Sequence, residues 1–526
     1  MILIALTIIV LVALYFYGTR TFKYWEKKGV KNDRPLPFLG NNARNYLMQK
    51  SATELAAEAY WKYPKEKVVG FYRSTKPEIV LRDPQLIKKV LTSDFYHFYP
   101  RGLNTHKTVV EPMLRNLFFA DGDLWRLLRQ RLTPAFTTGK LRAMFPLIVE
   151  RAERLQLRAL QATEQSGGVI DARDLMARYT TDFIGACGFG LDADSLQDDD
   201  SEFRRLGTKI FQLGIRNVAT NFLKELFPET FKHLKFLGNV EKTIMRLLKG
   251  VLKQRNYEQS KRNDFVDLLI ECKKKGTIVG ESIERVGADG KAARAELHVD
   301  DELLAAQMFV FFAAGFETSS SATSTALNEL AHNIHVQRKV QLEIDRVLAK
   351  HDNKLTYEAV KEMTYLEWTF KEAMRVFPSL GFLIRECARK YTFEDLNLTI
   401  DEEVSVIIPL QALHNDPKYF NEPQQFRPER FDPDVLNGDQ YKNVYLPFGD
   451  GPRACIGARL GMMQSLAGLA AVLSRFSVYP APGAPRYPRV NPASDIVQTV
   501  VGGVPLTFKL RESNGPIMID KTGCKI

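Results

Sequence analysis

A cysteine near the C-terminus, Cys455, stands among residue types that suit a metal-binding thiolate. The segment reads Phe448-Gly-Asp-Gly451-Pro-Arg453-Ala-Cys455-Ile-Gly457, and an apolar helical pattern follows it. A thiolate ligand needs positive charge and N–H donors near its sulfur. The start of the following helix favours negative charge as well. The segment predicts a thiolate ligand to haem iron, which would favour cleavage of a bound O–O bond.

The neighbours of Cys455 have expected roles around a haem. Arg453 could pair with a propionate through charge-assisted hydrogen bonds. Gly451 and Gly457 would let the backbone approach the flat macrocycle, and Phe448 would cover the sulfur. The alternative is a buried structural cysteine before a core helix. The combined spacing of these residues favours the haem ligand.

An acid and a hydroxyl lie side by side in the apolar helical run 303–330, within Ala314-Gly-Phe-Glu317-Thr318. Such groups are costly inside an apolar helix unless they pair or bind water. Cleavage of dioxygen needs two protons, which Glu317 could relay from solvent and Thr318 could hold by a hydrogen bond. The alternative is a core helix whose threonine bonds to the carbonyl four residues back.

The cysteine segment resembles the haem-ligand loop of the cytochrome P-450 family. Other segments of that family occur in its order: Trp125-x-x-x-Arg129, the acid–threonine pair, Glu372-x-x-Arg375 and Pro428-Glu-Arg430-Phe. The details resemble the microsomal enzymes of insects. The resemblance implies the family's fold, which is mainly α with small β-sheets (α+β), behind a single-pass N-terminal membrane anchor.

The resemblance also implies roles for residues outside the cysteine segment. Trp125, Arg129 and Arg385 would reach the haem propionates, and the alternative for each arginine is a solvated charge. Glu372 and Arg375 share a helix face at i, i+3 and would join Arg430 in a buried structural trio. The alternative for Glu372 and Arg375 is a surface ion pair worth under about 1 kcal/mol.

The substrate contacts are expected from loops and helices that the resemblance indicates. The candidates are Phe118, Phe119, Phe309, Phe312, Leu380, Phe382 and Leu383. Plain core packing is the alternative for each of them. Their apolar character predicts lipophilic substrates.

The N-terminus predicts an uncleaved membrane anchor. The uncharged run 2–17 would form a helix about 24 Å long, and the residues up to Phe22 extend it toward the thickness of the endoplasmic reticulum bilayer. Basic residues follow the run and none precedes it, which puts the body in the cytosol. A cleaved signal peptide is disfavoured by the missing basic start and the bulky Tyr15-Phe-Tyr17. We expect an anchor over 1–22, a basic Pro-rich hinge over 23–40 and a catalytic domain over 41–526.

Composition narrows the environment and the partners. Five cysteines at irregular spacing do not suggest a disulfide framework. Their pattern fits a reducing compartment. Cys524 lies third from the end, outside the pattern for prenylation. The net charge of +11 comes without a nucleic-acid motif, so an anionic membrane face or an acidic electron-donor protein is the expected partner.

The rest of the chain reads as mostly helical. A β-hairpin is predicted over 67–82, and strands over 403–409 and 496–510. Helices are predicted over 123–131, 141–161, 175–189, 200–260 and 300–350. The glycines and charges of 273–299 predict an exposed loop. His332 and His335 lack acidic or cysteine companions and are expected at the surface.

These predictions converge on a membrane-bound haem-thiolate monooxygenase that inserts one oxygen atom into a lipophilic substrate. It would hold haem b and receive electrons from NADPH through a separate NADPH–cytochrome P-450 reductase, with cytochrome b5 as a further partner. The donor would dock on the basic face over Cys455, against Arg126 and Arg131. The rivals are an oxygen-independent haem-thiolate isomerase or dehydratase, which would not need the acid–threonine pair, and a non-catalytic haem-binding sensor.

Overall fold

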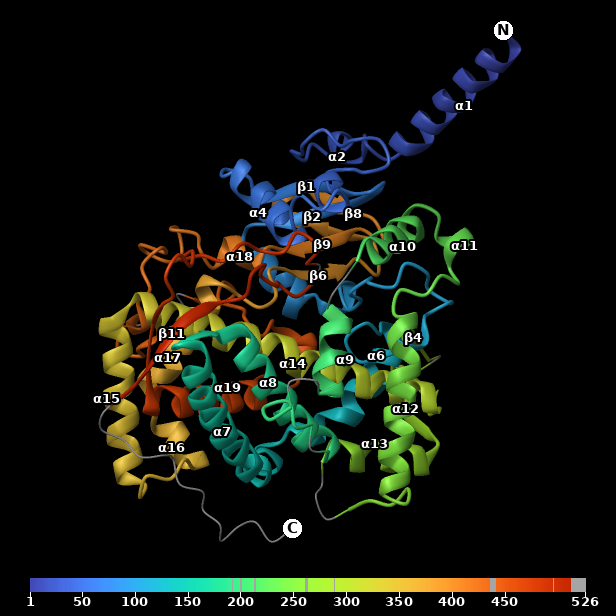
Figure 1. The fold of residues 1–526 in the computed structure, drawn as a ribbon. Coiled ribbons are helices and arrows are strands. Elements are labelled where there is room, and N and C mark those ends of the chain that lie inside the picture. Colours follow the sequence, from blue (N-terminus) through green and yellow to red (C-terminus); the bar gives the residue numbers. More distant parts are fainter. Residues whose placement is uncertain are drawn as a thin grey trace.

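The computed structural model describes residues 1–511 except 192, 199–200, 212–213, 261–263, 288, 436–440 and 495. Cys524 lies outside these residues. Most helices pack into one large body with small sheets at its sides, and the first helix projects from this body (Figure 1). The predicted mainly helical fold with small sheets is confirmed.

The helices follow in chain order. They are α1 (Ile2–Thr19), α2 (Tyr24–Lys27), α3 (Ala43–Tyr46), α4 (Ala52–Lys62), α5 (Pro84–Lys88), α6 (Gly122–Leu132), α7 (Thr138–Ser166), α8 (Ala172–Ile184), α9 (Glu202–Phe211), α10 (Ile215–Leu226), α11 (Pro228–Phe231), α12 (Gly238–Gln254), α13 (Phe265–Lys275), α14 (Asp301–His332), α15 (Ile334–Lys350), α16 (Tyr357–Glu362), α17 (Thr364–Val376), α18 (Leu410–Leu413) and α19 (Ala458–Arg475). Short 3-10 or π turns adjoin several of them.

The strands form small sheets. They are β1 (Val68–Arg73), β2 (Lys76–Leu81), β3 (Val169–Asp171), β4 (Thr277–Val286), β5 (Ala292–His298), β6 (Leu383–Glu386), β7 (Tyr391–Phe393), β8 (Leu398–Ile400), β9 (Ser405–Ile408), β10 (Phe476–Pro480) and β11 (Pro505–Leu510). The largest sheet among the described residues has the order β1-β2-β9-β6, with β9 parallel to β2 and antiparallel to β6. The predicted hairpin over 67–82 is confirmed by the pairing of β1 with β2.

Helix α14 runs through the core of the body. Asp300 starts it by accepting a hydrogen bond from the Leu303 amide at 2.6 Å. It ends at His332 and α15 begins at Ile334, so the single run predicted over 300–350 is two helices, α14 and α15. Helix α19 packs close by, where Gly468 leaves room for the ring of Tyr179: an added Cβ would lie 2.6 Å from that ring. This contact holds α19 against α8, which itself packs along α14.

Residues 273–299 are not the exposed loop that glycines and charges predicted. They contain the end of α13 and the antiparallel hairpin β4–β5. Ile278, Ile283 and Ala295 point inward and are buried, whereas charged residues occupy the outer face. A register shift between Glu281 and Val286 breaks the alternation on which strand prediction depends. The hairpin was therefore hidden by an irregular pattern.

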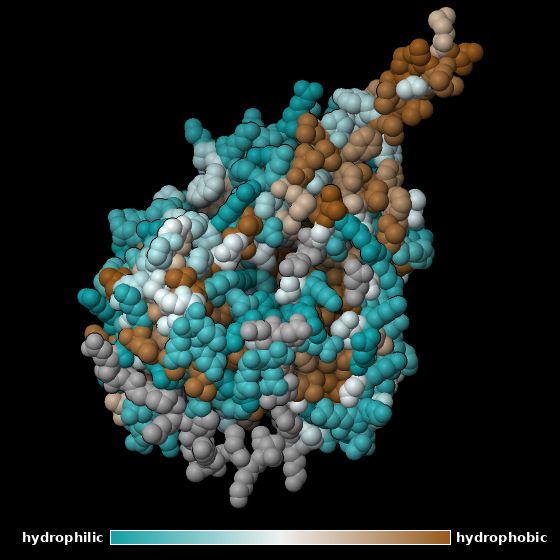
Figure 2. Space-filling view, in the orientation of Figure 1, coloured by the Kyte–Doolittle hydropathy of each residue, from teal (hydrophilic) through white to brown (hydrophobic). Residues whose placement is uncertain are grey.

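Helix α1 has the length and composition of a membrane span, with a mean hydropathy of 2.4 and 6% of its residues buried. Figure 2 shows it as a strongly hydrophobic projection from a mostly hydrophilic body. Its last turn packs on the body, because the ring of Tyr17 stacks on Phe227 at 5.8 Å. Gly18 faces Phe38, whose ring would lie 2.8 Å from an added Cβ. Helix α14 is also long and apolar, but it is mostly buried as a core helix.

Candidate active site

Cys455 lies in the short loop between the 3-10 turn Gly451–Arg453 and α19. Its amide donates to the Phe448 carbonyl at 2.8 Å, which closes the loop. The Cys455 side chain is exposed, whereas Cys187, Cys272 and Cys387 are buried.

The thiol of Cys455 is surrounded by protein despite this exposure. Desolvation raises its pKa, while a hydrogen bond from the Gly457 amide and the charges of Arg129 and Arg101 lower it. The accessible sulfur therefore has cations and an N–H donor beside it.

The two glycines flanking Cys455 differ in what they permit. Gly451 has a φ of +69°, and an added Cβ would collide with the carbonyl oxygen of Leu91. Its packing against the Leu91 backbone requires glycine there. A Cβ at Gly457 would meet only the Phe136 ring, at 3.7 Å. Phe448 is half-buried against the core cluster that contains α19.

Four arginines gather beside the cysteine loop: Arg101, Arg129, Arg385 and Arg453. Arg453 donates to the Asp121 carboxylate at 2.8 Å and to the Tyr99 carbonyl at 2.8 Å. Its guanidinium also lies over Trp125, 4.3 Å from the ring centre. The structure thus brings Trp125 and Arg453 together.

Arg129 and Arg385 join this cluster from other elements. Arg129 of α6 donates to the Ala454 carbonyl at 2.8 Å, directly before Cys455. Arg385 of β6 is 2% exposed and donates to its neighbouring carbonyl, that of Ile384, at 2.8 Å. The propionate partners predicted from distant parts of the chain therefore meet on one side of the cysteine loop.

The cluster has more positive than negative charge. Burial lowers the pKa of Arg385 to about 9, and the nearby charge of Arg101 adds to this effect. Burial likewise lowers the pKa of Arg101 to about 10. Nε of Arg385 and Nη1 of Arg453 are buried with no hydrogen-bond partner among the described residues. Each of these two nitrogens is a buried donor that still needs an acceptor, and the two propionates of a haem fit this donor set.

Arg101 and Asp121 belong to the cluster although the sequence did not identify them. The Arg101 guanidinium donates to the carbonyls of Phe118 at 2.7 Å and of Arg453 at 3.3 Å. Asp121 accepts from the Arg101 amide at 2.7 Å and thereby ties the loop to Arg453. No local pattern marks either residue, because Arg453, which both of them contact, lies at the other end of the chain.

Glu317 and Thr318 lie in the middle of α14, where Glu317 is buried and Thr318 is half-buried. Glu317 is 5% exposed and forms an ion pair with Arg173 of α8. Thr318 donates to the Ala314 carbonyl at 2.6 Å, which is the bond that the alternative interpretation predicted. Ala314 is exposed and Thr318 half-buried, although most of this helix is buried. The face that carries Thr318 therefore borders an accessible space.

The trio predicted from Glu372-x-x-Arg375 is assembled in the structure. Arg375 donates to both oxygens of Glu372, at 2.8 and 3.0 Å, and Arg430 donates to one of them at 3.2 Å. All three side chains are inaccessible or nearly so. Arg375 also donates to the His414 carbonyl at 2.9 Å. These bonds tie α17 to the segments that precede the cysteine loop.

His414 makes the stability of this region depend on pH. Burial lowers the pKa of His414 to about 3, helped by the charge of Arg375, and its Nε2 accepts from the Leu446 amide at 3.0 Å. Its contribution to stability is complete above the unfolded-state pKa of about 6.5 and is lost as pH falls toward 3. Lowering the pH from 7 to 5 should therefore cost about 2 kcal/mol through this residue.

Urea unfolding at several pH values measures this effect. His414→Gln should flatten the decline in unfolding free energy between pH 6.5 and 5, whereas the exposed His335→Gln should leave it unchanged. An identical slope in the wild type and His414→Gln would contradict the assignment.

The candidate substrate residues divide between core and accessible positions. Phe309 and Phe312 are 3% and 0% exposed, and Phe312 stacks on Phe316 at 6.0 Å. Phe382 is 4% exposed in a core cluster beside the largest sheet. For these three the structure shows the core packing that was the alternative. Phe118, Phe119, Leu380 and Leu383 are half-buried.

Two of these half-buried residues border the site already described. The Arg101 guanidinium lies 4.3 Å from the centre of the Phe118 ring. A Cβ added at Gly449 would contact Leu383 at 3.9 Å. Phe118 and Leu383 therefore lie beside the arginine cluster and the cysteine loop.

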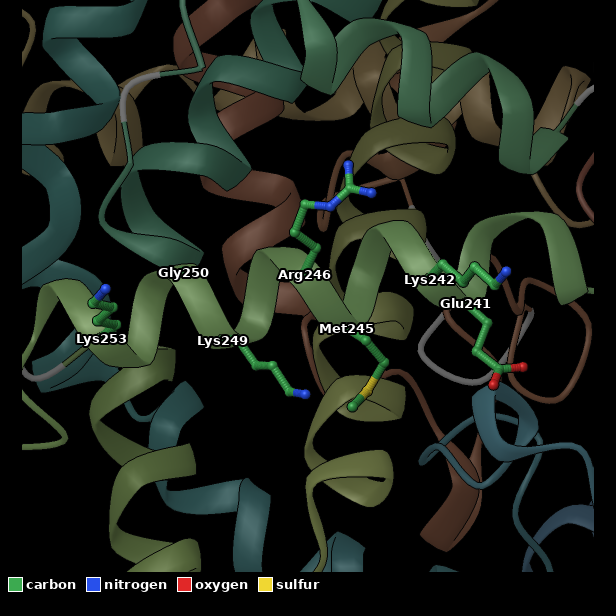
Figure 3. A pocket seen from close by; sticks show the side chains of 7 residues that line it. All are labelled: Glu241, Lys242, Met245, Arg246, Lys249, Gly250 and Lys253. Atoms are coloured by element: carbon green, nitrogen blue, oxygen red, sulfur yellow. The ribbon is translucent and has the colours of Figure 1, made fainter.

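A surface groove of about 550 Å³ lies along α12, away from these residues. It is lined by Glu241, Lys242, Met245, Arg246, Lys249, Gly250 and Lys253. Figure 3 shows that Arg246 points away from Lys249 and Met245, so the side chains do not converge on one point. The groove contains neither the cysteine nor the acid–threonine pair.

Histidine and acidic side chains do not build a metal centre in the part of the chain that the structure describes. His335 is exposed, and His332 bonds to the Asn328 carbonyl of its own helix at 2.9 Å.

Comparison with known proteins gives one consistent result. The family model described as cytochrome P-450 matches residues 31–502. Cytochrome P-450 6a2 of Drosophila melanogaster is 37% identical over 513 residues, 95% of this chain and 98% of its own length. Cytochrome P-450 6B6 of Helicoverpa armigera is 34% identical over 497 residues, 93% and 94% of the two chains. Cytochrome P-450 6B1 of Papilio polyxenes is 36% identical over 486 residues, 91% and 94%.

Proposed function

Because this chain belongs to the cytochrome P-450 family and is a haem-thiolate monooxygenase, we propose that Cys455 is the axial ligand of haem b iron. The observation that carries this assignment is the accessible thiol of Cys455 beside a buried arginine cluster with unpartnered donors. Arg129, Arg385 and Arg453 bind the propionates together with Trp125, and Arg101 adds to their charge. Gly451 and Gly457 shape the cysteine loop, and Phe448 shields the sulfur.

When bound, a haem with a thiolate ligand supplies the electron density that favours cleavage of the O–O bond. The protein's own contribution is to hold protons close to the site and to exclude bulk water from it. The Thr318 hydroxyl already donates its hydrogen to the Ala314 carbonyl. The lone pairs of Oγ1 can therefore accept a hydrogen bond from a group on the accessible side. Glu317 is positioned to pass protons from solvent once its carboxylate leaves Arg173.

Thr318→Ala should uncouple electron use from product formation. Without the hydroxyl, protons are no longer held at the correct place, so we expect the product formed per NADPH to fall about tenfold or more while haem content is unchanged. The matched control is Thr323→Ala, since Thr323 makes the same bond to the carbonyl four residues back but is fully buried. NADPH, peroxide and product are measured together. Equal coupling in the wild type and Thr318→Ala would exclude the proposed role.

The electrons come from NADPH through a separate flavoprotein, NADPH–cytochrome P-450 reductase, with cytochrome b5 as a further donor. The sequence supports this because the chain carries no dinucleotide-binding fingerprint of its own. Residues 1–22 anchor the protein in the endoplasmic reticulum membrane, and 23–40 connect the anchor to the catalytic domain 41–526. The basic residues after the apolar run support a cytosolic orientation of that domain.

The substrates are small lipophilic compounds, including foreign compounds such as plant toxins and insecticides. Phe118, Phe119, Leu380 and Leu383 are the accessible apolar candidates for contact with them. The buried Phe309, Phe312 and Phe382 would instead support these contacts from behind. An oxygen-independent isomerase is disfavoured, because Glu317 and Thr318 are retained in the helix that borders the site.

An absorption spectrum of the purified, dithionite-reduced protein with carbon monoxide tests this assignment. A strongly red-shifted Soret band is expected for a thiolate ligand. A band typical of a histidine ligand, or folded protein without haem, would overturn the role of Cys455. Reductase-dependent NADPH use with product formation then excludes a haem-binding sensor.

A further inference from the structure

The β4–β5 hairpin covers one flank of α6, the helix that carries Trp125 and Arg129. Ile283 and Ala295 of the hairpin join the core cluster that contains Leu127 of α6. Gly280 allows this close packing, because an added Cβ would lie 2.7 Å from both Leu127 and Gln130. The hairpin is therefore a fixed part of the surface beside the cysteine loop.

Polar contacts fasten the same hairpin to the start of α6. The Asp123 carboxylate accepts hydrogen bonds from the Ser282 hydroxyl and the Ile283 amide, each at 2.8 Å. Arg285 lies 3.6 Å from the same carboxylate. The hairpin thus neutralises an acid of α6 as well as covering its apolar flank.

The basic residues of α6 that were expected to meet an electron donor already have acidic partners. Arg126 pairs with Glu281 of β4 at 3.5 Å, and Arg131 pairs with Glu271 of α13. The two pairs differ in exposure: the Glu281 side chain is 70% exposed and that of Glu271 is 35%. Nε of Arg126 is buried and has no hydrogen-bond partner within the described residues. Arg126 therefore has an exposed and easily displaced partner.

We propose that Glu281 occupies part of the docking surface for the acidic electron-donor protein and competes with a donor carboxylate for Arg126. This inference rests on the proposed function, since it assumes a donor that approaches on the Cys455 side. Helix α6 lies on that side because Arg129 bonds to the carbonyl before Cys455. An acidic donor is favoured by the chain's net charge of +11 and by the cation beneath Glu281. Docking exchanges one carboxylate for another at Arg126.

The test compares two glutamates of the same hairpin. Glu281→Gln releases Arg126, whereas Glu296→Gln removes the same charge from an exposed residue that pairs with Arg294 instead. Full-length, haem-loaded protein in detergent is titrated with the soluble flavin domain of a NADPH–cytochrome P-450 reductase, and Kd is measured at several salt concentrations. We expect Glu281→Gln to bind about threefold to fivefold more tightly than Glu296→Gln at low salt, with the difference shrinking as salt rises.

A double variant shows whether the gain acts through Arg126. Glu281→Gln combined with Arg126→Gln should lose the gain and bind no better than Arg126→Gln alone. Equal affinities of Glu281→Gln and Glu296→Gln would overturn the inference while leaving the haem assignment intact, and weaker binding by Glu281→Gln would make Glu281 a donor contact instead. Failure of the proposed function itself would appear separately, as the absence of the red-shifted carbon monoxide band in the wild type.

Discussion

Replacing Cys455 by serine is expected to abolish the red-shifted carbon monoxide band and to lower monooxygenase turnover by at least about a thousandfold. A hydroxyl is a far weaker electron donor to iron than a thiolate, so the push that favours O–O cleavage is lost. Some haem should stay bound, since Arg129, Arg385 and Arg453 still offer donors to its propionates. Spectra and product formation are measured on the same preparation.

Cys387→Ser provides the matched control for this substitution. Cys387 is buried and its thiol donates to the Arg389 carbonyl at 2.9 Å, a bond that a serine can also make. This variant should keep the wild-type spectrum. Turnover that survives in Cys455→Ser would show that another residue ligates the iron.

The second large effect is expected from Glu372→Gln. The Glu372 carboxylate accepts from Arg375, from Arg430 and from the Arg427 amide at 3.0 Å, with no exposed surface. A glutamine would leave two buried guanidinium groups uncompensated and turn an N–H₂ group toward their donors. Breaking a buried pair by removing one partner costs about 3–5 kcal/mol. We expect most of the protein to be misfolded or free of haem.

Thermal unfolding and haem content measure this loss. A second variant on the same helix, Glu367→Gln, serves as the comparison. Glu367→Gln breaks the pair between Glu367 and Lys371, which are 36% and 32% exposed and lie on α17 as well. That change should cost less than about 0.5 kcal/mol. Similar melting temperatures for the two variants would be evidence against a structural role for Glu372.

The parts of the site that the sequence could predict are those encoded by local spacing. The loop around Cys455, the pair Glu372–Arg375 and the helix with Glu317 and Thr318 all depend on residues within a few positions of each other. Helix and hairpin periodicity likewise predicted β1–β2 and most of the helices. Short-range geometry sufficed in each case.

The parts that were not predicted depend on contacts between distant segments. Arg173 reaches Glu317 across 144 residues and Arg101 reaches the Arg453 carbonyl across 352, so no pattern joins them. The β4–β5 hairpin was missed for a different reason. Few of its side chains are buried, and its register shifts. Gly280 is a residue type common in loops, but here it allows the close approach of α6.

The contacts at the end of α1 set the direction in which this helix leaves the body. Because Tyr17 stacks on Phe227 and Gly18 fits against Phe38, the first helix packs on the body and is not joined to it by a flexible linker alone. In the membrane orientation proposed above, a body held in this way would keep one tilt and one height above the lipid surface. A donor anchored in the same membrane would then find it by a two-dimensional search with few orientations to sample. Loosening these contacts would slow productive encounters without altering any residue of the site.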